Sequence, residues 1–242
     1  MKLAIDIGNT QIKFGIFNNH KLLKSLHFND SSNISKKLAS FKEFNPSIII
    51  ISSVVPLLTS KYIKEVSKTF KANVFIINYM NCNINLNVPC PETVGTDRIC
   101  NIAAALKFYS LPAIVIDFGT ATTYDAINKI GDFIGGVIAP GVKTSADYLI
   151  NKAALLSPTD LSFPSNVIGK NTKENIQSGI MYGALDQIEG MIKRINKETE
   201  IENNIILTGG FSQLLSPKLS INHTLDIDLT LKGMIAINES NN

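Results

Sequence analysis

The 242-residue sequence has only three cysteines and three histidines, and both shortages exclude classes of protein. An odd number of widely spaced cysteines (Cys82, Cys90 and Cys100) does not form a disulfide framework, and no Cys-x-x-Cys pair is present to bind zinc. The histidines lie outside every motif described below, so a Ser-His-Asp mechanism and a histidine-rich metal site have no support. We therefore expect a protein of the reducing cytoplasm.

Long apolar runs and basic runs are also missing. The longest apolar run, at residues 48–51, is far too short to span a bilayer, and Asp6 interrupts the N-terminal stretch where a signal peptide would be apolar. The 23 Lys and Arg residues are dispersed and nearly matched by 20 Asp and Glu residues. They form no basic cluster with interleaved aromatics, so neither nucleic acid nor membrane is expected as a partner. A hydrophobic fraction of 45% indicates a globular protein with an ample core.

One tetrapeptide pattern occurs twice, about half a chain apart. Residues 5–8 read Ile-Asp-Ile-Gly and residues 116–119 read Ile-Asp-Phe-Gly. Each copy follows an apolar run and precedes a short polar stretch and a second apolar run, which predicts strand, tight turn and returning strand. Strand-like and helix-like segments then alternate, which favours the α/β class. We expect two related halves, residues 1–111 and 112–242, that meet near Leu111-Pro112 with a central cleft.

The remaining patterns give a coarse map of the other elements. Helices are expected over residues 32–44, 56–70, 97–109, 141–156, 171–196 and 230–237. Strands are expected over residues 47–52, 74–77 and 205–207, with one or two more within 125–139. Residues 81–93 and 157–168 are expected to be loops. Asn171 and Glu174 have the spacing of a capping box at the start of the long helix.

The first turn, residues 6–10, has the residue types that bind phosphate. It lies between two predicted strands and not before a helix, which separates it from Walker and Rossmann loops. Gly8 allows phosphate to approach the backbone, Asp6 can hold a hydrated Mg²⁺, and Lys13 can reach a phosphate as a point charge. A turn that merely satisfies its own backbone is the alternative for a single copy. Two copies favour phosphate binding.

The order of the motifs resembles that of the type III pantothenate kinases. The resemblance rests on residues 6–10, 95–98, 117–123, 135–141, 169–172 and 208–210, and it spans nearly the whole chain. It implies two ribonuclease H-like domains of the actin-like ATPase and sugar kinase fold. It also implies that ATP phosphorylates the primary hydroxyl of pantothenate to give 4′-phosphopantothenate, the first step of coenzyme A biosynthesis.

The resemblance further implies cofactors, an assembly and residue roles. Enzymes of this family are homodimers that use Mg²⁺ and a monovalent cation, potassium or ammonium. Asp97 is implied as the general base, Asp117 as the ligand of the monovalent cation, and Asp6 as the residue near Mg²⁺. The implied ATP contacts are Asp6, Ile7, Gly8, Asn9, Thr10, Gln11, Ile12, Lys13 and Thr120. The implied pantothenate contacts are Gly95, Thr96, Asp97, Arg98 and Thr172.

These roles agree with the chemistry of the side chains, although each has a plainer alternative. Asp97 can orient a hydroxyl and accept its proton, or simply cap a helix. Arg98 can bind a carboxylate through two N–H groups, or remain a solvated side chain. Asp117 can offer oxygen to a cation or be a copy of the first turn kept for the fold, and Thr172 can contact substrate or cap a helix. The two glycines at 209–210 can lie against adenine or form a tight turn.

One departure from the family and two alternative functions remain open. Val88 occupies a position, three residues before Pro91, where many relatives have a tyrosine, so one side of the pantothenate pocket is undefined. The chain could be another small-molecule kinase of the superfamily, but residues 95–98 favour pantothenate. It could instead be a non-catalytic regulator that resembles these kinases, but a regulator has no need of Asp6 and Asp97.

Overall fold

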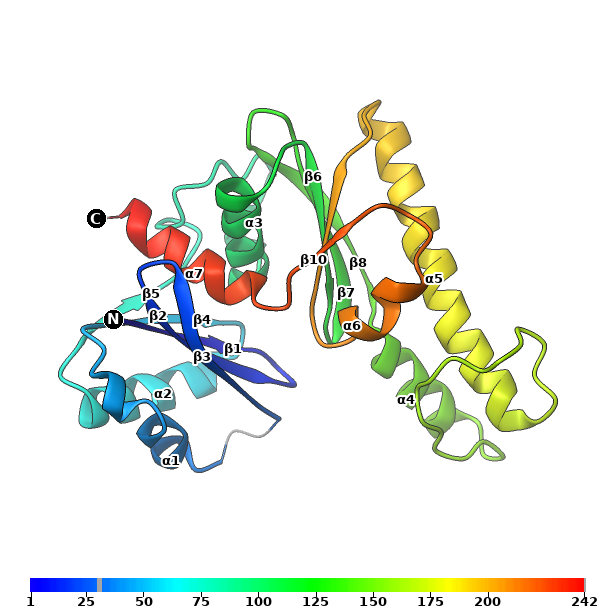
Figure 1. The fold of residues 1–242 in the computed structure, drawn as a ribbon, viewed down its shortest axis with the longest axis horizontal. Helices are drawn as coiled ribbons and strands as arrows, with labels where there is room; N and C mark the ends of the chain where they lie inside the picture. Colours follow the sequence, from blue (N-terminus) through cyan, green and yellow to red (C-terminus); the bar gives the residue numbers. More distant parts are fainter. Residues whose placement is uncertain (30–31, 242) are drawn as a thin grey trace. The chain divides into compact units, whose positions relative to one another are not determined.

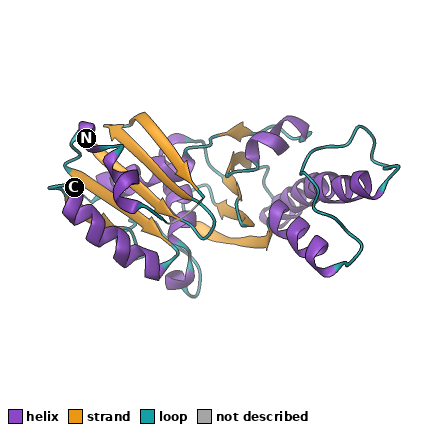
Figure 2. Cartoon of the chain, turned by 90° about the horizontal axis from the view of Figure 1, so that it is seen from below, coloured by secondary structure: helices purple, strands orange, loops and turns teal. Residues whose placement is uncertain are grey.

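The structure, a computed structural model, describes residues 1–29 and 32–241 and divides into two compact units. Unit 1 comprises Met1–Ser110, Gly131–Phe133 and Asp228–Asn242, and unit 2 comprises Leu111–Ile130 and Ile134–Ile227. Each unit contains one five-stranded sheet in the described part of the chain, and helices cover the sheets (Figures 1 and 2). The α/β class is therefore confirmed.

The sheet of unit 1 has the strand order β3-β2-β1-β4-β5. Its strands are β1 (Lys2–Ile7), β2 (Ile12–Asn18), β3 (Lys21–Phe28), β4 (Ile48–Ser53) and β5 (Asn73–Ile76). The central strand β1 is antiparallel to β2 and parallel to β4, and its residues from Leu3 to Ile7 are buried. A strand buried on both faces needs a near-continuous apolar sequence, which this segment has apart from Asp6.

Two pairs of helices cover the sheet of unit 1 (Figure 1). The pairs are α1 (Ile34–Ala39) with α2 (Pro56–Thr69), and α3 (Thr96–Phe108) with α7 (Leu229–Ser240). Beneath α1 and α2, the ring of Phe14 packs against those of Phe41 and Tyr62 at centroid distances of 5.6 and 6.0 Å. On the other side, a Cβ atom at Gly233 of α7 would collide with the backbone of Cys100 in α3, so the glycine permits the close approach of these helices.

The sheet of unit 2 repeats the arrangement of unit 1. Its strands are β6 (Ala113–Phe118), β7 (Ala121–Ile127), β8 (Phe133–Pro140), β9 (Asn204–Thr208) and β10 (Thr224–Leu225), in the order β10-β9-β6-β7-β8. As in unit 1, the central strand, here β6, is antiparallel to the strand that follows it in the chain, β7. It is parallel to its other neighbour in the sheet, β9. Helices α4 (Val142–Lys152) and α5 (Thr172–Thr199) pack together in this unit, which also contains the short helix α6 (Ser212–Leu215). The predicted relationship between the halves is thus confirmed.

Some predicted elements differ from the observed ones. The helix expected over residues 32–44 is wrong in extent, because α1 ends at Ala39 and a 3-10 turn, η1 (Lys42–Phe44), follows. Between them Phe41 leaves helical geometry and becomes fully buried against Phe14. Residues 30–31, between β3 and α1, lie outside the described part of the chain. The sequence patterns did not indicate β3, β10 or α6.

The C-terminal helix joins the first unit, whereas the sequence placed all residues after 111 in the second half. Helix α7 is buried on most of its circumference, from Leu229 to Asn238, and it packs against α3. A helix that is apolar all round must be covered on all sides, but its pattern does not say which sheet supplies the cover. The segment Gly131–Phe133, which ends at the first residue of β8, also belongs to unit 1.

Candidate functional site

The first polar turn joins β1 to β2 in unit 1. Asp6 is nearly the last residue of β1, and the sheet register places it beside Lys13 of β2 and Ser52 of β4. The amide of Gly8 donates a 3.0 Å hydrogen bond to the carbonyl of Gln11, and a Cβ atom at Gly8 would lie only 2.9 Å from that oxygen. The two residues between them, Asn9 and Thr10, are exposed. The turn therefore offers polar side chains beside a half-buried lysine.

A chain of oxygen atoms connects this turn to the start of α3. Ser52 Oγ, at the carboxyl end of β4, lies 3.0 Å from Asp6 Oδ1 and 3.1 Å from Thr96 Oγ1. The amide of Ser53 also donates to Thr96 Oγ1 at 3.0 Å. Asp6 is 7% exposed and Ser52 is fully buried, so water competes little for these bonds. The structure therefore brings Asp6 and the 95–98 motif together, as the predicted site requires.

Asp97 lies in the first turn of α3 and is not its N-cap. The N-cap is Gly95, so the plainer interpretation of Asp97 is wrong. Asp97 Oδ1 accepts a 2.8 Å hydrogen bond from the amide of Arg98, and a Cβ atom at Gly95 would lie 2.5 Å from the same oxygen. The amide dipoles at the start of a helix favour a carboxylate at this position. The missing Cβ atom of Gly95 thus leaves room for the Asp97 carboxylate, and the Arg98 amide at the helix start holds it.

The pKa of the buried Cys100 thiol depends on the charges of both carboxylates. Burial raises the pKa of Cys100 well above its ordinary value, and the negative charges of Asp6 and Asp97 raise it further. Cys100 is therefore a neutral thiol that packs within the core, as expected of a structural cysteine. The two acidic side chains proposed for metal and proton chemistry both act on this one buried atom.

The second half of the 95–98 motif contacts an aromatic ring. The guanidinium carbon of Arg98 lies 5.4 Å from the ring centroid of Phe133, the first residue of β8. A bridge between Phe133 and Leu86 ties this ring to the loop that carries Val88. The sequence motif indicated Arg98, whereas nothing in the spacing of the motifs indicated Phe133.

One histidine lies nearer to the first turn than the sequence suggested. His27 of β3 is the register partner of Lys13. Burial lowers the pKa of His27, the charge of Lys13 lowers it further, and Asp228 opposes these effects. The imidazole is therefore neutral near pH 7 and adds no positive charge beside the lysine.

The second polar turn joins β6 to β7 in unit 2 and has similar geometry. The amide of Gly119 donates to the carbonyl of Ala121 at 3.1 Å. The carbonyl of Thr120 accepts from the amide of Gly141 at 3.1 Å and from the hydroxyl of Thr144 at 2.6 Å, so the start of α4 supports this turn. Thr120 itself is exposed, as a residue that contacts nucleotide must be.

Oxygen atoms surround Asp117 in this second turn. The sheet register places Asp117 beside Thr123 of β7 and Thr208 of β9, and register partners lie on the same face of a sheet. The hydroxyl oxygens of both threonines are buried and form no hydrogen bond within the described residues. Gly209, at φ 92°, brings its backbone so close that a Cβ atom would collide with the Asp117 carboxylate. A carboxylate with neutral oxygens suits a hard monovalent cation.

The residues fit this cation better than they fit a transition metal. The described residues contain no group of three or more His, Cys, Asp and Glu side chains that could hold a metal ion. Such groups are typical of zinc and iron sites. A monovalent cation at Asp117, or Mg²⁺ that arrives with phosphate groups at Asp6, needs no such group.

Thr172 is the first residue of α5 and is exposed. The N-cap of this helix is Asn171, whose side chain accepts a 3.0 Å hydrogen bond from the amide of Glu174. Glu174 in turn accepts from the amide of Lys170 at 2.7 Å. The predicted cap at Asn171 and Glu174 is confirmed, so the hydroxyl of Thr172 is not needed as the cap.

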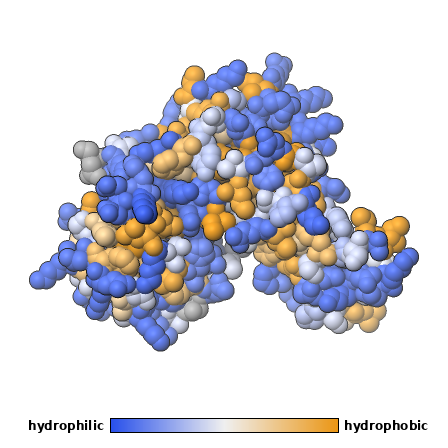
Figure 3. Space-filling view, viewed as in Figure 1, coloured by the Kyte–Doolittle hydropathy of each residue, from blue (hydrophilic) through white to orange (hydrophobic). Residues whose placement is uncertain are grey.

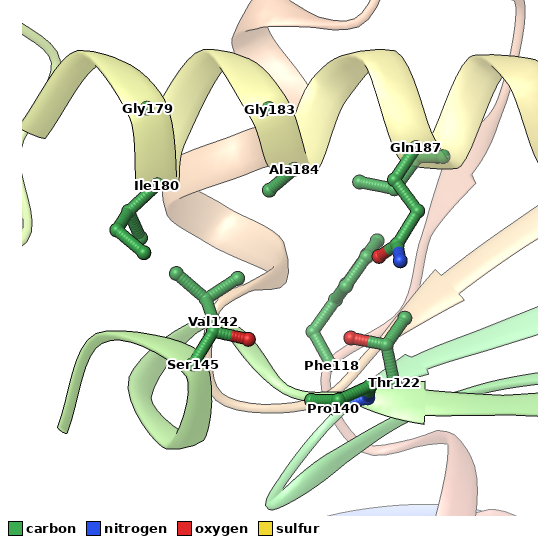
Figure 4. Close-up of a pocket in the computed structure, with 11 residues that line it drawn as sticks. Phe118, Thr122, Pro140, Val142, Ser145, Gly179, Ile180, Gly183, Ala184 and Gln187 are labelled. Atoms are coloured by element: carbon green, nitrogen blue, oxygen red, sulfur yellow. The ribbon is translucent and has the colours of Figure 1, made fainter. Parts of the chain in front are cut away.

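A cavity of about 240 Å³ lies within unit 2 between α4 and α5 (Figure 4). Phe118 and Thr122 line it from the sheet, while Gly179 and Gly183 line it from α5. This volume is below the usual range for sites of cofactors and drug-sized ligands, about 300–1,000 Å³. None of the predicted site residues lines it.

The sequence contained a signal for two further polar side chains that lie beside the acidic residues of the two turns. Ser52 and Thr208 each lie at the carboxyl end of a parallel strand, beside the strand that carries an acidic residue, Asp6 or Asp117. The carboxyl ends of parallel strands meet at one edge of a sheet, which is where ligands bind in open α/β sheets. A polar residue directly after each apolar run was the available clue.

Comparisons with known proteins agree with this geometry. A family model described as type III pantothenate kinase matches residues 2–194. A protein named type III pantothenate kinase from Sulfurihydrogenibium sp. (strain YO3AOP1) is 37% identical over 246 residues, which cover 97% of this chain and 98% of that protein.

Solved structures show the same fold at lower identity. A Baf family transcriptional activator from Campylobacter jejuni, described as putative, superposes with a TM-score of 0.62 at 23% identity, over 99% of this chain and 98% of the other. The activator of 2-hydroxyisocaproyl-CoA dehydratase from Clostridium difficile gives 0.58 at 12% identity, over 99% and 95%. The fold is that of the actin-like ATPases and sugar kinases.

Among the described residues, no helix combines the length and the apolar composition that a membrane span requires.

Proposed function

The chain belongs to the type III pantothenate kinase family, and on that basis we propose which of its residues carry each part of the reaction. The reaction is the phosphorylation of pantothenate by ATP in coenzyme A biosynthesis. The alternatives, another small-molecule kinase or a non-catalytic regulator, are not favoured. The main support for these roles is the hydrogen-bonded connection from Asp6 through Ser52 to Thr96, the residue before Asp97.

We propose Asp97 as the general base. The primary hydroxyl of pantothenate attacks the γ-phosphorus of ATP, a new P–O bond forms, and the bond to the oxygen of ADP breaks. Asp97 accepts the proton that the hydroxyl loses. Because the transition state of phosphoryl transfer is loose, the proton leaves late and the carboxylate needs no raised pKa. The support is the position of Asp97 at a helix start, where Gly95 and the Arg98 amide hold its carboxylate.

We propose that the first turn binds the phosphates of ATP. Residues 6–12 supply backbone and side-chain donors, and Lys13 adds a positive charge. Asp6 would hold Mg²⁺, which when bound neutralises the charge on the transferred phosphoryl group. Ser52 keeps the Asp6 carboxylate oriented through their 3.0 Å contact. Thr120, exposed on the second turn, is proposed as a further ATP contact.

We propose that Gly95, Thr96, Arg98 and Thr172 bind pantothenate, and that Asp97 contacts its primary hydroxyl. The guanidinium of Arg98 suits the carboxylate of pantothenate, because it can donate two parallel N–H bonds. The support for Thr96 is that its hydrogen bonds with Ser52 and Ser53 hold the start of α3 against the end of β4. Thr172 is exposed and is not the N-cap of α5, so its hydroxyl can bind substrate.

We propose that Asp117, Thr123 and Thr208 hold the monovalent cation, potassium or ammonium. The support is the pair of buried threonine oxygens beside the carboxylate, since a bound cation would satisfy groups that are otherwise costly to bury. One positive charge there would also offset the charge of ATP phosphates near the second turn.

We propose a homodimer that works in the cytoplasm. Unit 2 exposes large apolar side chains on β8, on α4 and in the loop after α4; examples are Ile138 (64% exposed), Tyr148 (67%) and Leu155 (95%). Figure 3 shows apolar surface in the region of α4 and that loop. Exposed patches of this kind mark interfaces, and sedimentation analysis would test the assembly. Three free cysteines suit a reducing compartment.

Steady-state ADP release tests the proposal. Turnover should require pantothenate and should be faster in potassium than in sodium. Asp97→Asn should lower kcat by about 100- to 10,000-fold and leave the KM for pantothenate nearly unchanged. Glu43→Gln, which affects an exposed pair with Lys24 in unit 1, is the control and should retain full activity. An Asp97→Asn enzyme with the kcat of the unmodified protein would remove the base from the mechanism.

A further inference from the structure

The segment Gly131–Phe133 brings an aromatic ring to the arginine of the substrate motif. Phe133 is 1% exposed, and its ring centroid lies 5.4 Å from the guanidinium carbon of Arg98. Both residues belong to unit 1, although Phe133 is also the first residue of β8. No family motif discussed above includes Phe133.

The backbone of Phe133 is fixed from both sides. Its amide donates to the carbonyl of Asn85 at 3.0 Å, and its carbonyl accepts from the amide of Asn87 at 2.9 Å. The side chain of Asn85 also donates to Asp132 Oδ1 at 2.7 Å. These bonds hold the segment against the loop at residues 85–88, so the ring is a rigid support and not a mobile contact.

A ring below a guanidinium group orients it without consuming its hydrogen-bond donors. The five N–H groups of arginine lie in the guanidinium plane, whereas an aromatic ring attracts the cation through the face of that plane. Because this contact is made through the ring face, it uses none of the in-plane N–H groups and is compatible with bidentate recognition of a carboxylate. Preorganisation of this kind lowers the entropy lost when a ligand binds.

We propose that Phe133 is a positioning residue that orients Arg98 toward the carboxylate of the substrate, and thereby selects a carboxylate over a neutral group. This inference rests on the proposed role of Arg98 in binding pantothenate. It adds a specificity determinant that lies 35 residues after Arg98 in the sequence, outside the substrate motif.

The experiment compares pantothenate with its neutral primary amide. In the unmodified enzyme, pantothenate-dependent ADP release first tests the proposed function itself. Phe133→Leu removes the ring face and keeps an apolar side chain. It should raise the KM for pantothenate about 2- to 30-fold, in line with the measured range of cation–π interactions, with kcat and the KM for ATP nearly unchanged. The KM for the amide should stay within about twofold of its value in the unmodified enzyme, because the amide carries no charge for the Arg98 guanidinium to attract.

Two further variants separate positioning from general packing. In an Arg98→Gln background, Phe133→Leu should have little further effect on the KM for pantothenate, because the cation is already gone. Phe108→Leu, which removes an exposed ring on the same helix as Arg98, is the matched control and should change neither KM nor kcat. Thermal unfolding tests whether each variant is folded. If Phe133→Leu is not folded, Phe133→Met replaces it.

The outcomes are distinct. If the unmodified enzyme does not use pantothenate, the proposed function and this inference both fail. If it does, and Phe133→Leu leaves the KM for pantothenate unchanged, the inference alone fails. It also fails if the KM values for pantothenate and the amide rise equally, since that would show a packing role. A selective rise for pantothenate that disappears in the Arg98→Gln background supports it.

Discussion

Replacing Gly95 with alanine is expected to slow phosphoryl transfer about 100-fold while the fold stays intact. The added Cβ atom would lie 2.5 Å from Asp97 Oδ1, and its next neighbours, at 3.6 Å, are in ordinary contact. The only atom that must move is therefore the carboxylate oxygen of the proposed base. Ordinary contact begins at 3.4 Å, so the oxygen must shift by 3.4 − 2.5 = 0.9 Å.

The size of the effect follows from that displacement. A misplacement of about 1 Å can cost about 100-fold in rate, because proton transfer and in-line attack depend on short, aligned contacts. The shift would also disturb the 2.8 Å bond from the Arg98 amide that holds the carboxylate. We therefore expect kcat to fall about 100-fold, with the KM for ATP unchanged, since the first turn is not altered.

Stability should change little in the same variant. Gly95 has φ −57° and ψ 142°, a conformation that alanine adopts without strain. Alanine restricts the unfolded chain and so stabilises by about 0.4–1 kcal/mol, while it is a poorer N-cap than glycine by a similar amount. These effects offset each other, so the free energy of unfolding should stay within about 1 kcal/mol.

The measurement is ADP release under saturating pantothenate, with thermal unfolding in parallel. Gly190→Ala on α5 is the matched control, because a Cβ atom there meets nothing within 4 Å. It should keep the activity of the unmodified enzyme. A folded Gly95→Ala variant with normal kcat would show that the carboxylate tolerates displacement, and Asp97 would then not be the base.

Three further predictions concern the cation, an ion-pair cluster and the cysteines. Thr208→Val, which removes a buried hydroxyl at nearly constant shape, should raise the potassium concentration for half-maximal activity about 10-fold, and an unchanged activation curve would exclude Thr208 as a ligand. Burial alone would raise the pKa of Glu239, but the bond from Lys107 at 2.7 Å and the nearby positive charges lower it below its ordinary value of 4.5. A lowered pKa contributes stability above that ordinary value, which is lost as the pH falls through the folded value. Glu239→Gln should therefore lower the free energy of unfolding at pH 7 by up to about 1 kcal/mol, and equal melting temperatures at pH 7 would contradict this. Of the three thiols only Cys90 is exposed, and burial raises the pKa of Cys100, so brief alkylation at pH 8 should label Cys90 alone by peptide mass spectrometry; early labelling of Cys100 would contradict this.

The strands and turns were predictable because local patterns determine them. Apolar runs on both sides of a polar turn gave β1 with β2 and β6 with β7, and the long helix α5 was indicated by its cap at Asn171. In contrast, β3 has alternating half-buried residues that form no apolar run, so no pattern distinguished it from a loop. Its pairing with β2 depends on tertiary contact.

The residues of the candidate site could be predicted from the sequence only where they lie within a recognised motif. Residues 95–98 were indicated by resemblance, and the structure then connected Thr96 to Asp6 through Ser52. The partners of Arg98 could not be predicted in the same way. Phe133 contacts the arginine because the segment Gly131–Phe133 belongs to unit 1, and sequence periodicity does not show that a segment of the second half joins the first unit.

The two related turns show how one scaffold can hold two different charges. In unit 1 the register partner of Asp6 is Lys13, whose side chain carries a positive charge. In unit 2 the equivalent partner of Asp117 is Thr123, which is neutral and has an unsatisfied buried oxygen.

The half-buried Asp117 carboxylate lies beside neutral threonine oxygens, so a bound cation would add a positive charge that these register partners do not supply. The second turn is therefore the one where a monovalent cation bound by protein alone is expected. At the first turn, where lysine is present, a divalent ion is favourable mainly once phosphate groups add negative charge. On this reasoning Thr123→Lys, which copies the first turn into the second, should make activity independent of potassium.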